Sequence, residues 1–254
     1  LLGGGGSQIR GLGRAIEKAL AEYGGGKVNV DSVLQIVDPI EISNPSGASD
    51  FFARPAIWFN SITLSADSAV SADPNSLANT EDRIGPDVYG NEIVGNSINA
   101  FFISIQTAPG QPTRQLDIAG RITHTDIVYV LSANLVITGN PGGLYMPDPN
   151  DPTHTGWSAN ISGSLVIDPG VILKMNGATI QMQVGGSQLI AEGTASNPIV
   201  MTSINDNTYG AGGTFLTGNN ASVTPKAGDW GGLFFNSNSS GSVDHAIIEY
   251  GGGS

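Results

Sequence analysis

Short apolar runs alternate with turn residues along most of this chain, most regularly between residues 163 and 206. Each run is too short for a helix and is rich in β-branched residues, so each predicts a β-strand. Similar runs return about every 20–25 residues, a spacing typical of stacked turns of chain rather than of a meander of hairpins. The clearest runs are residues 165–167, 171–175, 180–184, 189–191 and 199–202.

This pattern predicts an all-β fold, and specifically a right-handed parallel β-helix in which each turn of chain packs only on its neighbours. We expect the solenoid to occupy residues 27–254, with loop insertions near residues 73–90, 140–160 and 205–229, which are rich in polar residues, proline and glycine. The last run, residues 243–250, ends inside the pattern, so we expect the β-helix to continue beyond residue 254. A β-sandwich or jelly roll is the alternative, but it requires more hairpin turns.

One amphipathic helix is predicted, within residues 9–26. Its apolar residues recur at three- and four-residue spacing, and a run of glycines ends it. We expect this helix to cap the open end of the β-helix by covering apolar side chains and unpaired backbone; an unrelated helix packed on a flank is the alternative. Residues 1–8 are predicted to be a linker or an upstream tail. The apolar stripe consists of Ile9, Leu12, Ile16, Leu20 and Tyr23.

Composition narrows the range of partners. Only 13% of the residues are charged and 36 are glycine, which favours a turn-rich all-β fold over a helical one. The net charge of −12 argues against a nucleic-acid partner, because that binding depends on Lys and Arg that neutralise phosphates. The absence of cysteine excludes disulfides and thiolate metal sites, and no apolar run is long enough for membrane insertion.

Several phrases in the chain carry a family resemblance. The segment LIAEGTASNPIVMTS (residues 189–203) and the later GDWGGLFF (residues 228–235) look like a repeated module, as does SVDHAIIEYGG (residues 242–252). This module resembles that of very large β-helical extracellular proteins of planctomycete-like bacteria. The phrase AIEKALAEYGGGKVNV (residues 15–30) resembles the helix-capped start of pectate-lyase-like and tailspike-like β-helices.

The resemblance implies an extracellular or cell-surface structural role, as a stalk, an adhesin or a component of a fibre or matrix. It implies no catalytic residues, because it brings no defined activity. The partners it implies are further turns of the same polypeptide or other copies of it. A strand edge left open at the end of the β-helix could pair with such a copy.

Motifs for catalysis are absent from the sequence. Polysaccharide-hydrolysing β-helices show adjacent aspartates, a His-Gly pair and an Arg-Ile-Lys, and none of these occurs here. Asp229 and Glu249 could form the carboxylate pair of a glycosidase, but Asp229 in Gly-Asp-Trp is more simply explained as a turn residue. Lys174 is expected on an exposed strand face, where it would be solvated. We therefore predict a protein that is not an enzyme, with a polysaccharide lyase or hydrolase as the less favoured alternative.

The predicted loops contain the candidate metal-binding residues. Calcium is the predicted cofactor, because acidic loops supply the carboxylate, amide and carbonyl oxygens that it prefers. The alternative is a set of Asx turns at bends of the chain. The histidines, His124, His154 and His245, are far apart in sequence and give no zinc pattern. His245, next to Asp244, is expected at a bend of the chain or on its outer face. The calcium candidates are Asp148, Asn150 and Asp151 in one loop and Asp206 and Asn207 in another, with Asp73 and Asn75 in a third.

Aromatic residues supply one further candidate for glycan binding. Trp157 lies in a polar loop, where its ring could stack on a sugar. Trp58 and Trp230 fall in apolar runs and are predicted to be packed in the fold. A glycan- or calcium-binding module is therefore the alternative to a purely structural role.

Overall fold

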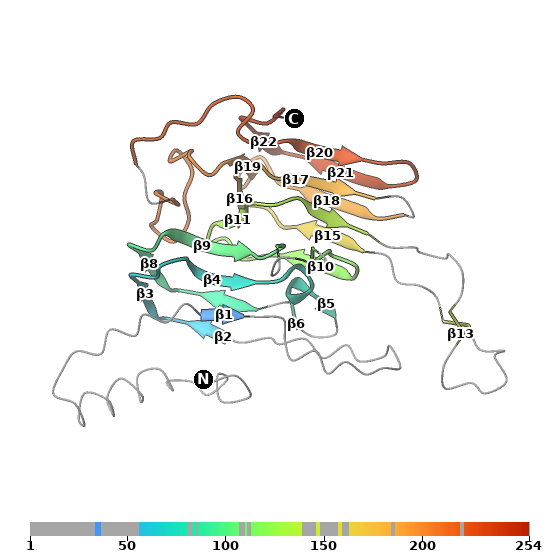
Figure 1. Cartoon of the computed structure of the whole chain (residues 1–254), viewed down its shortest axis with the longest axis horizontal. Helices are drawn as coiled ribbons and strands as arrows, with labels where there is room; N and C mark the ends of the chain where they lie inside the picture. Colours follow the sequence, from blue (N-terminus) through green and yellow to red (C-terminus); the bar gives the residue numbers. More distant parts are fainter. Residues whose placement is uncertain are drawn as a thin grey trace, which may run out of the picture.

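A computed structural model describes residues 34–36, 56–80, 83–84, 86–106, 110, 113–138, 146–147, 157–158, 163–183, 186–218 and 221–253. The helix predicted within residues 9–26 lies outside these residues. The regular secondary structure of the described part is almost entirely short strands, stacked from β2 in blue to β22 in red (Figure 1). The all-β class and the parallel pairing of the strands, both predicted from the sequence, are confirmed.

Three parallel sheets, which we call sheets I, II and III, contain most of the strands. Sheet I contains β1 (Leu34–Ile36), β4 (Ser68–Ala72), β9 (Ile98–Ile103), β11 (Tyr129–Leu131), β16 (Ile172–Met175), β19 (Ile199–Ser203) and β22 (Ala246–Ile248). Sheet II contains β10 (Ala119–Ile122), β15 (Ser164–Ile167), β18 (Gln188–Glu192) and β21 (Ser240–Asp244). Sheet III contains β12 (Leu135–Ile137), β17 (Thr179–Met182) and β20 (Gly232–Phe235).

From β10 onward the chain visits these sheets in a fixed order. It runs from sheet II to sheet I to sheet III as β10, β11 and β12, and repeats this order as β15, β16 and β17 and again as β18, β19 and β20. Strands β21 and β22 begin the order once more. Neighbouring parallel strands cannot be joined by a tight hairpin. Here the strands of the other two sheets form each crossover.

Shorter strand pairs complete the described chain. Strand β2 (Ala56–Trp58) pairs in parallel with β7 (Asp87–Tyr89), and β3 (Ser61–Thr63) with β8 (Glu92–Val94). Within residues 73–90, predicted as a loop, lie the 3₁₀ helix η2 (Pro74–Leu77), the antiparallel pair β5 (Asn79–Thr80) and β6 (Arg83–Ile84), and β7. Within residues 140–160, the described parts are the antiparallel strands β13 (Met146–Pro147) and β14 (Trp157–Ser158).

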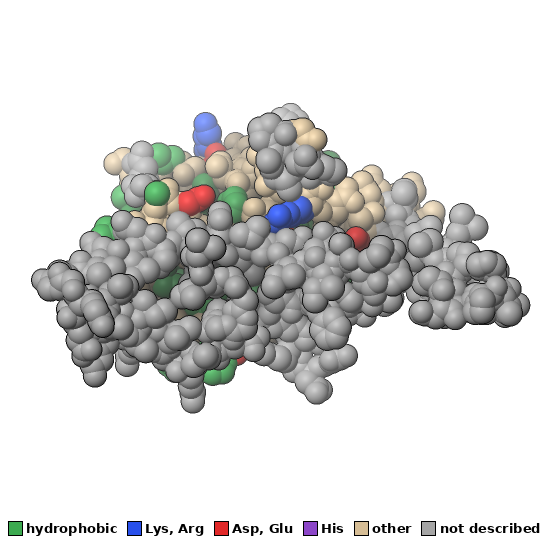
Figure 2. All heavy atoms as spheres, turned by 60° about the horizontal axis from the view of Figure 1, so that its bottom comes forward, with side chains coloured by type: hydrophobic (Ala, Val, Ile, Leu, Met, Phe, Trp, Pro, Cys, Tyr) green, Lys and Arg blue, Asp and Glu red, His purple; other side chains and the backbone are tan. Residues whose placement is uncertain are grey.

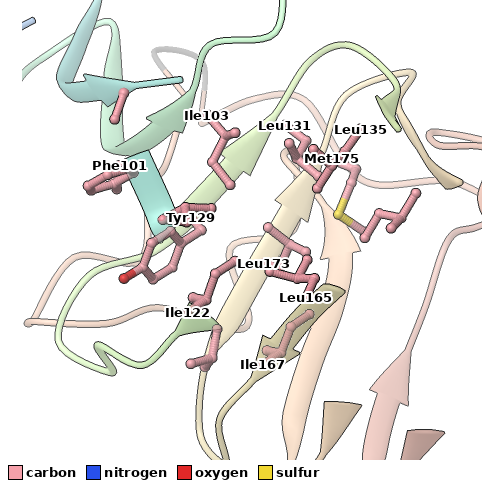
Figure 3. Close-up of a cluster of buried hydrophobic side chains, with 14 of the residues drawn as sticks. Phe101, Ile103, Ile122, Tyr129, Leu131, Leu135, Leu165, Ile167, Leu173 and Met175 are labelled. Carbon is pink, nitrogen blue, oxygen red and sulfur yellow. The ribbon is translucent and has the colours of Figure 1, made fainter. Parts of the chain in front are cut away.

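The strand register aligns inward-facing side chains into columns. In sheet I, Tyr129 pairs with Phe101 on one side and with Leu173 on the other, and Leu173 pairs with Met201. All of these side chains are buried, and the rings of Phe101 and Tyr129 lie 5.2 Å apart. Figure 3 shows Phe101, Tyr129 and Leu173 in one cluster with Leu135 of sheet III and with Ile122, Leu165 and Ile167 of sheet II. Burying each such side chain contributes about 1.5–3 kcal/mol, so these columns form the core.

Buried asparagines hold the bend between β2 and β3 and the bend after β3. The Asn91 side chain donates to Ile57 O (2.7 Å) and accepts from Asn60 N. Asn96 does the same one bend later, donating to Ile62 O (2.9 Å) and accepting from Ser65 N. Bends leave main-chain groups without ladder partners, and these amides satisfy them inside the protein.

Candidate functional site

Residues 205–218 cover the outer face of sheet I. Tyr209 and Ala211 pack against a cluster of outward-facing apolar residues. The side chain of Thr214 donates to Ile93 O (2.7 Å), and that of Asn99 donates to Leu216 O (3.0 Å). The outward-facing apolar residues are Ala100, Val128, Val130, Ile172 and Val200. This part of the loop predicted at residues 205–229 is therefore a packed covering of the sheet, and we call it the cover segment.

Close approach of the cover segment to the sheet requires glycine at one position. Gly212 has a left-handed backbone, with φ of 58°, and a Cβ atom there would lie 2.2 Å from Asp126 O. Any larger residue would have to move the segment away from the 123–127 turn.

The prediction that Lys174 is solvated is wrong. Lys174 lies on the outer face of β16 between Val130 and Thr202, and its side chain is fully buried. Its Nζ donates to Asp206 O (2.6 Å) and Phe215 O (3.3 Å), both carbonyls of the cover segment. The sequence predicts correctly that Lys174 lies on the outward face of its strand. The cover segment, 30 or more residues later in the chain, buries that face.

Burial lowers the pKa of the Lys174 ammonium to about 8, although the nearby Asp206 opposes this shift. Desolvation penalises the charged form of a buried amine, and here only two carbonyls and one carboxylate compensate it. Lys174 has no exposed surface, so it is not presented to a substrate. We interpret it as an anchor of the cover segment.

The calcium candidates Asp206 and Asn207 begin the cover segment. The Asp206 carboxylate is buried, accepting from Thr202 Oγ1 (2.8 Å) and from Thr208 N (2.9 Å). The second of these bonds is that of an Asx turn, the alternative interpretation of this loop. Asn207 Oδ1 is buried without a hydrogen-bond partner. Within the described part of the chain, no group of three or more His, Asp or Glu side chains is placed to hold a metal ion.

Asp148, Asn150 and Asp151 lie outside the described residues, and for Trp157 only the strand β14 is described. Calcium binding there, and glycan stacking on Trp157, stay predictions. The predicted packing of Trp230 is confirmed, since it is 1% exposed and its Nε1 donates to Glu249 O (2.7 Å).

Asp229 fixes a turn, as its position in Gly-Asp-Trp indicates. Its Oδ2 accepts hydrogen bonds from Ser203 Oγ (2.5 Å), Lys226 N (3.2 Å) and Asn205 Nδ2 (3.5 Å). Partial burial raises the pKa of this carboxyl, but the hydrogen bonds from Ser203, Lys226 and Asn205 outweigh burial and hold the pKa below its usual value. An ionised carboxylate with this many donors is a poor general acid.

The described histidines lie apart from each other. His124 Nε2 is 3.7 Å from Asp87 Oδ1, in a contact between β7 and the 123–127 turn. His245 is exposed, lies between β21 and β22, and has Nδ1 3.0 Å from Asp244 Oδ2. This is the position at a bend of the outer surface that the sequence predicts for it. His154 lies outside the described residues.

A polar cavity of about 330 Å³ lies between η2 and residues 113–117, which precede β10. Asp73 lines this cavity, and only 1% of its surface is exposed. Asp73 Oδ1 accepts from Ser76 N (2.9 Å) and Ser76 Oγ (3.2 Å), whereas Oδ2 has no hydrogen-bond partner. Arg114 Nη1 lies 3.7 Å from Oδ2. The cavity is lined by Asp73, Pro74, Asn75, Thr113, Arg114, Gln115 and Asp117.

The sequence indicates only the part of this cavity that Asp73 and Asn75 form. Asp73 and Asn75 stand out as an acidic turn, but Arg114, Gln115 and Asp117 form no motif with them. The two halves meet because Asn75 Nδ2 donates to Asp117 Oδ1 (2.8 Å) across 42 residues of chain. Nothing in the local pattern of either half signals this contact.

Comparison with known proteins gives no relative. The sequence matches no protein-family profile and no curated protein, and the fold matches no solved structure. No helix in the described residues has the length and apolar character needed to cross a membrane. On the face shown in Figure 2, the described Lys and Arg side chains are well separated and form no basic patch.

Proposed function

We propose that this chain is a right-handed parallel β-helix and forms a structural segment of a large secreted or cell-surface bacterial protein. The observation that carries the proposal is the repeated order of strands through sheets II, I and III with the register kept from strand to strand. Crossovers between parallel strands of one sheet are right-handed in nearly all proteins, which supports the proposed hand.

Such a segment acts through its geometry. Within the three sheets each strand pairs only with the strands of the turns before and after it, so the backbone ladders run along one direction. Continuous ladders resist bending, and this suits a stalk, an adhesin or a fibre. Loops on the side of the rod carry any recognition.

The face formed by β20, β21 and β22 supports the proposed stacking. Phe235 pairs with the buried Met182, Val243 with the buried Ala191, and Ile248 with the buried Met201. The register therefore continues the inward columns to these residues, yet they are 47%, 39% and 47% exposed. We call them the end face. Among the described residues, the outer edges of β20, β21 and β22 pair with no further strand. An apolar end face with such edges fits a further layer of the same kind, from the same polypeptide or from a second copy.

Sedimentation velocity of the 254-residue chain tests this proposal. We expect association that increases with concentration and that Phe235→Lys or Ile248→Lys weakens by about tenfold or more, because each places a charge in the apolar contact. Val94→Lys is the matched control, since Val94 is 49% exposed but lies in β8, away from the end face. Equal association of all three variants and the unaltered chain would contradict stacking through this face.

A glycan-binding module is the second candidate function. The cavity at Asp73 favours it, because one buried carboxylate and several partly exposed polar side chains line a space of small-molecule size there. The two functions are compatible, since a rod can present a binding site on its side.

A further inference from the structure

We propose that the cavity at Asp73 and Arg114 binds a neutral saccharide, as a mono- or disaccharide unit of a glycan. This goes beyond the structural role, and it does not depend on stacking through the end face. The cavity of about 330 Å³ lies at the small end of the range of about 300–1,000 Å³ usual for small-molecule sites.

The unpaired oxygen of Asp73 is the first argument. Asp73 Oδ1 is used by Ser76, but Oδ2 is buried and accepts no hydrogen bond. Leaving a buried acceptor without a donor is unfavourable, so the site favours a ligand that brings one. Arg114 Nη1 is 3.7 Å away, beyond hydrogen-bond distance, and offers a donor beside this acceptor.

Sugar hydroxyls match this pair of groups. A hydroxyl both donates and accepts, so one hydroxyl can donate to Asp73 Oδ2 and accept from Arg114, or two neighbouring hydroxyls can share these roles. Hydrogen bonds to charged groups are roughly twice as strong as those between neutral groups. Two neighbouring hydroxyls can bond to the Asp73 carboxylate and to the Arg114 guanidinium at the same time.

Part of the cavity wall is held in place by hydrogen bonds within the protein, before any ligand binds. Asn75 Nδ2 donates to Asp117 Oδ1 (2.8 Å), and Asp117 N donates to Asn75 Oδ1 (3.3 Å). This reciprocal pair joins η2 to residues 113–117. Thr113 and Gln115 are exposed at the rim and offer a hydroxyl and an amide, which can each donate and accept. A preformed polar wall limits the ordering that binding would otherwise require.

The charges in the cavity favour a neutral sugar over the other ligands that an aspartate can bind. A calcium ion needs several oxygen ligands and would lie against the Arg114 guanidinium, which carries the same sign of charge. An acidic sugar would face the carboxylates of Asp73 and Asp117 with only Arg114 to compensate. A ligand with hydroxyls and no net charge meets neither repulsion.

NMR titration of the 254-residue chain with single ligands tests the proposal. The probes are the methyl glycosides of glucose, galactose, mannose and N-acetylglucosamine, with glucuronate and calcium chloride titrated separately. We expect at least one neutral glycoside to shift the amide signals of Asn75, Ser76, Gln115 and Asp117 with a millimolar Kd. Asp73→Asn should weaken that binding by about tenfold to a hundredfold, because the charged acceptor is lost.

Three variants separate binding from folding. Arg114→Met leaves the buried Asp73–Ser76 turn intact and should also weaken binding by about tenfold. Ser76→Ala removes a partner of Asp73 Oδ1 but no group that lines the cavity, so it should leave the Kd within about twofold. Arg121→Met breaks the pair between Arg121 and Asp168 (2.9 Å) outside the cavity and should leave the Kd unchanged.

Two results would overturn the proposal. One is the absence of shifts at these amides with every neutral glycoside at concentrations on the order of 100 mM. The other is a response to calcium or glucuronate that exceeds the response to all of the neutral glycosides and is lost in Asp73→Asn.

Discussion

Asn91, Asn96 and Lys174 are buried side chains that donate hydrogen bonds to main-chain carbonyls. The acceptors of the asparagines, Ile57 O and Ile62 O, lie in β2 and β3 just before a bend, and the acceptors of Lys174 lie in the cover segment. The asparagine side chains are neutral, so their burial removes no charge from water. Lys174 is ionisable, so its contribution to stability changes with pH.

The sign of the Lys174 effect follows from its lowered pKa. Below about pH 8 the amine is protonated in both the folded and the unfolded chain, and the folded state carries the full desolvation penalty. Between about pH 8 and 10.5 the folded chain binds fewer protons than the unfolded chain, so the free energy of unfolding rises with pH. We expect a gain of about 2–3 kcal/mol between pH 7.5 and 10, measured by urea denaturation.

Lys174→Met should abolish this gain, and Lys226→Met should retain it because Lys226 is exposed. The scan ends at pH 10 because burial raises the pKa of Tyr129 and desolvation, together with Glu249 and Asp206, raises the pKa of Tyr209. Raised phenol pKa values lower stability above pH 10, where the unfolded tyrosines ionise first. An equal slope in Lys174→Met and the unaltered chain would show that Lys174 does not cause the gain.

At the scale of the element, the cover segment turns the outer face of sheet I into a second, smaller core. It is attached by the apolar contacts of Tyr209 and Ala211 and by side-chain bonds from Thr214, Asn99 and Lys174. Its attachment is therefore divided among several weak contacts, and each should affect how often the segment opens.

Hydrogen exchange measured by mass spectrometry can detect that opening. Thr214→Val keeps the shape of the side chain but removes the bond to Ile93 O, at a cost of about 1 kcal/mol. If the segment opens locally, exchange in residues 205–218 should become roughly fivefold faster while β16 and β19 stay protected. Thr208→Val is the control on the same segment, because Thr208 is exposed. Faster exchange spread equally over sheet I would instead indicate that the segment and the sheet unfold together.

At the scale of the whole molecule, stability should vary along the stack. Leu173 and Ile248 face inward in the same sheet, each next to Met201 in register. Leu173 has neighbours on both sides and is fully buried, whereas Ile248 is 47% exposed. In a stack with nearest-neighbour contacts, an interior position contributes two interfaces and an end position only one.

We therefore expect Leu173→Ala to lower the free energy of unfolding by about 2–5 kcal/mol, as is usual for a cavity in a packed core. Ile248→Ala should lower it by less than about 1 kcal/mol in the 254-residue chain. Denaturant unfolding followed by circular dichroism measures both values. Equal losses would mean that the end face is as well packed as the middle of the stack.

The sequence determined the class of fold and the positions of many strands. Runs such as residues 165–167 and 199–202 lie within β15 and β19, because β-branched runs bounded by Asp, Pro, Asn and Gly have few other stable conformations. The packing of Trp230, the turn at Asp229 and the exposed bend at His245 follow from the same local chemistry. These features depend on residues near each other in the chain.

The tertiary structure decided which surfaces stay exposed and which polar groups meet. Lys174 faces outward by the alternation of β16, yet it is buried because residues 205–218 fold back over sheet I. Asp73 and Arg114 line one cavity because η2 and residues 113–117 are brought together across the fold. Periodicity reports the direction of a side chain relative to its own strand, whereas burial and the composition of a site depend on contacts between segments distant in sequence.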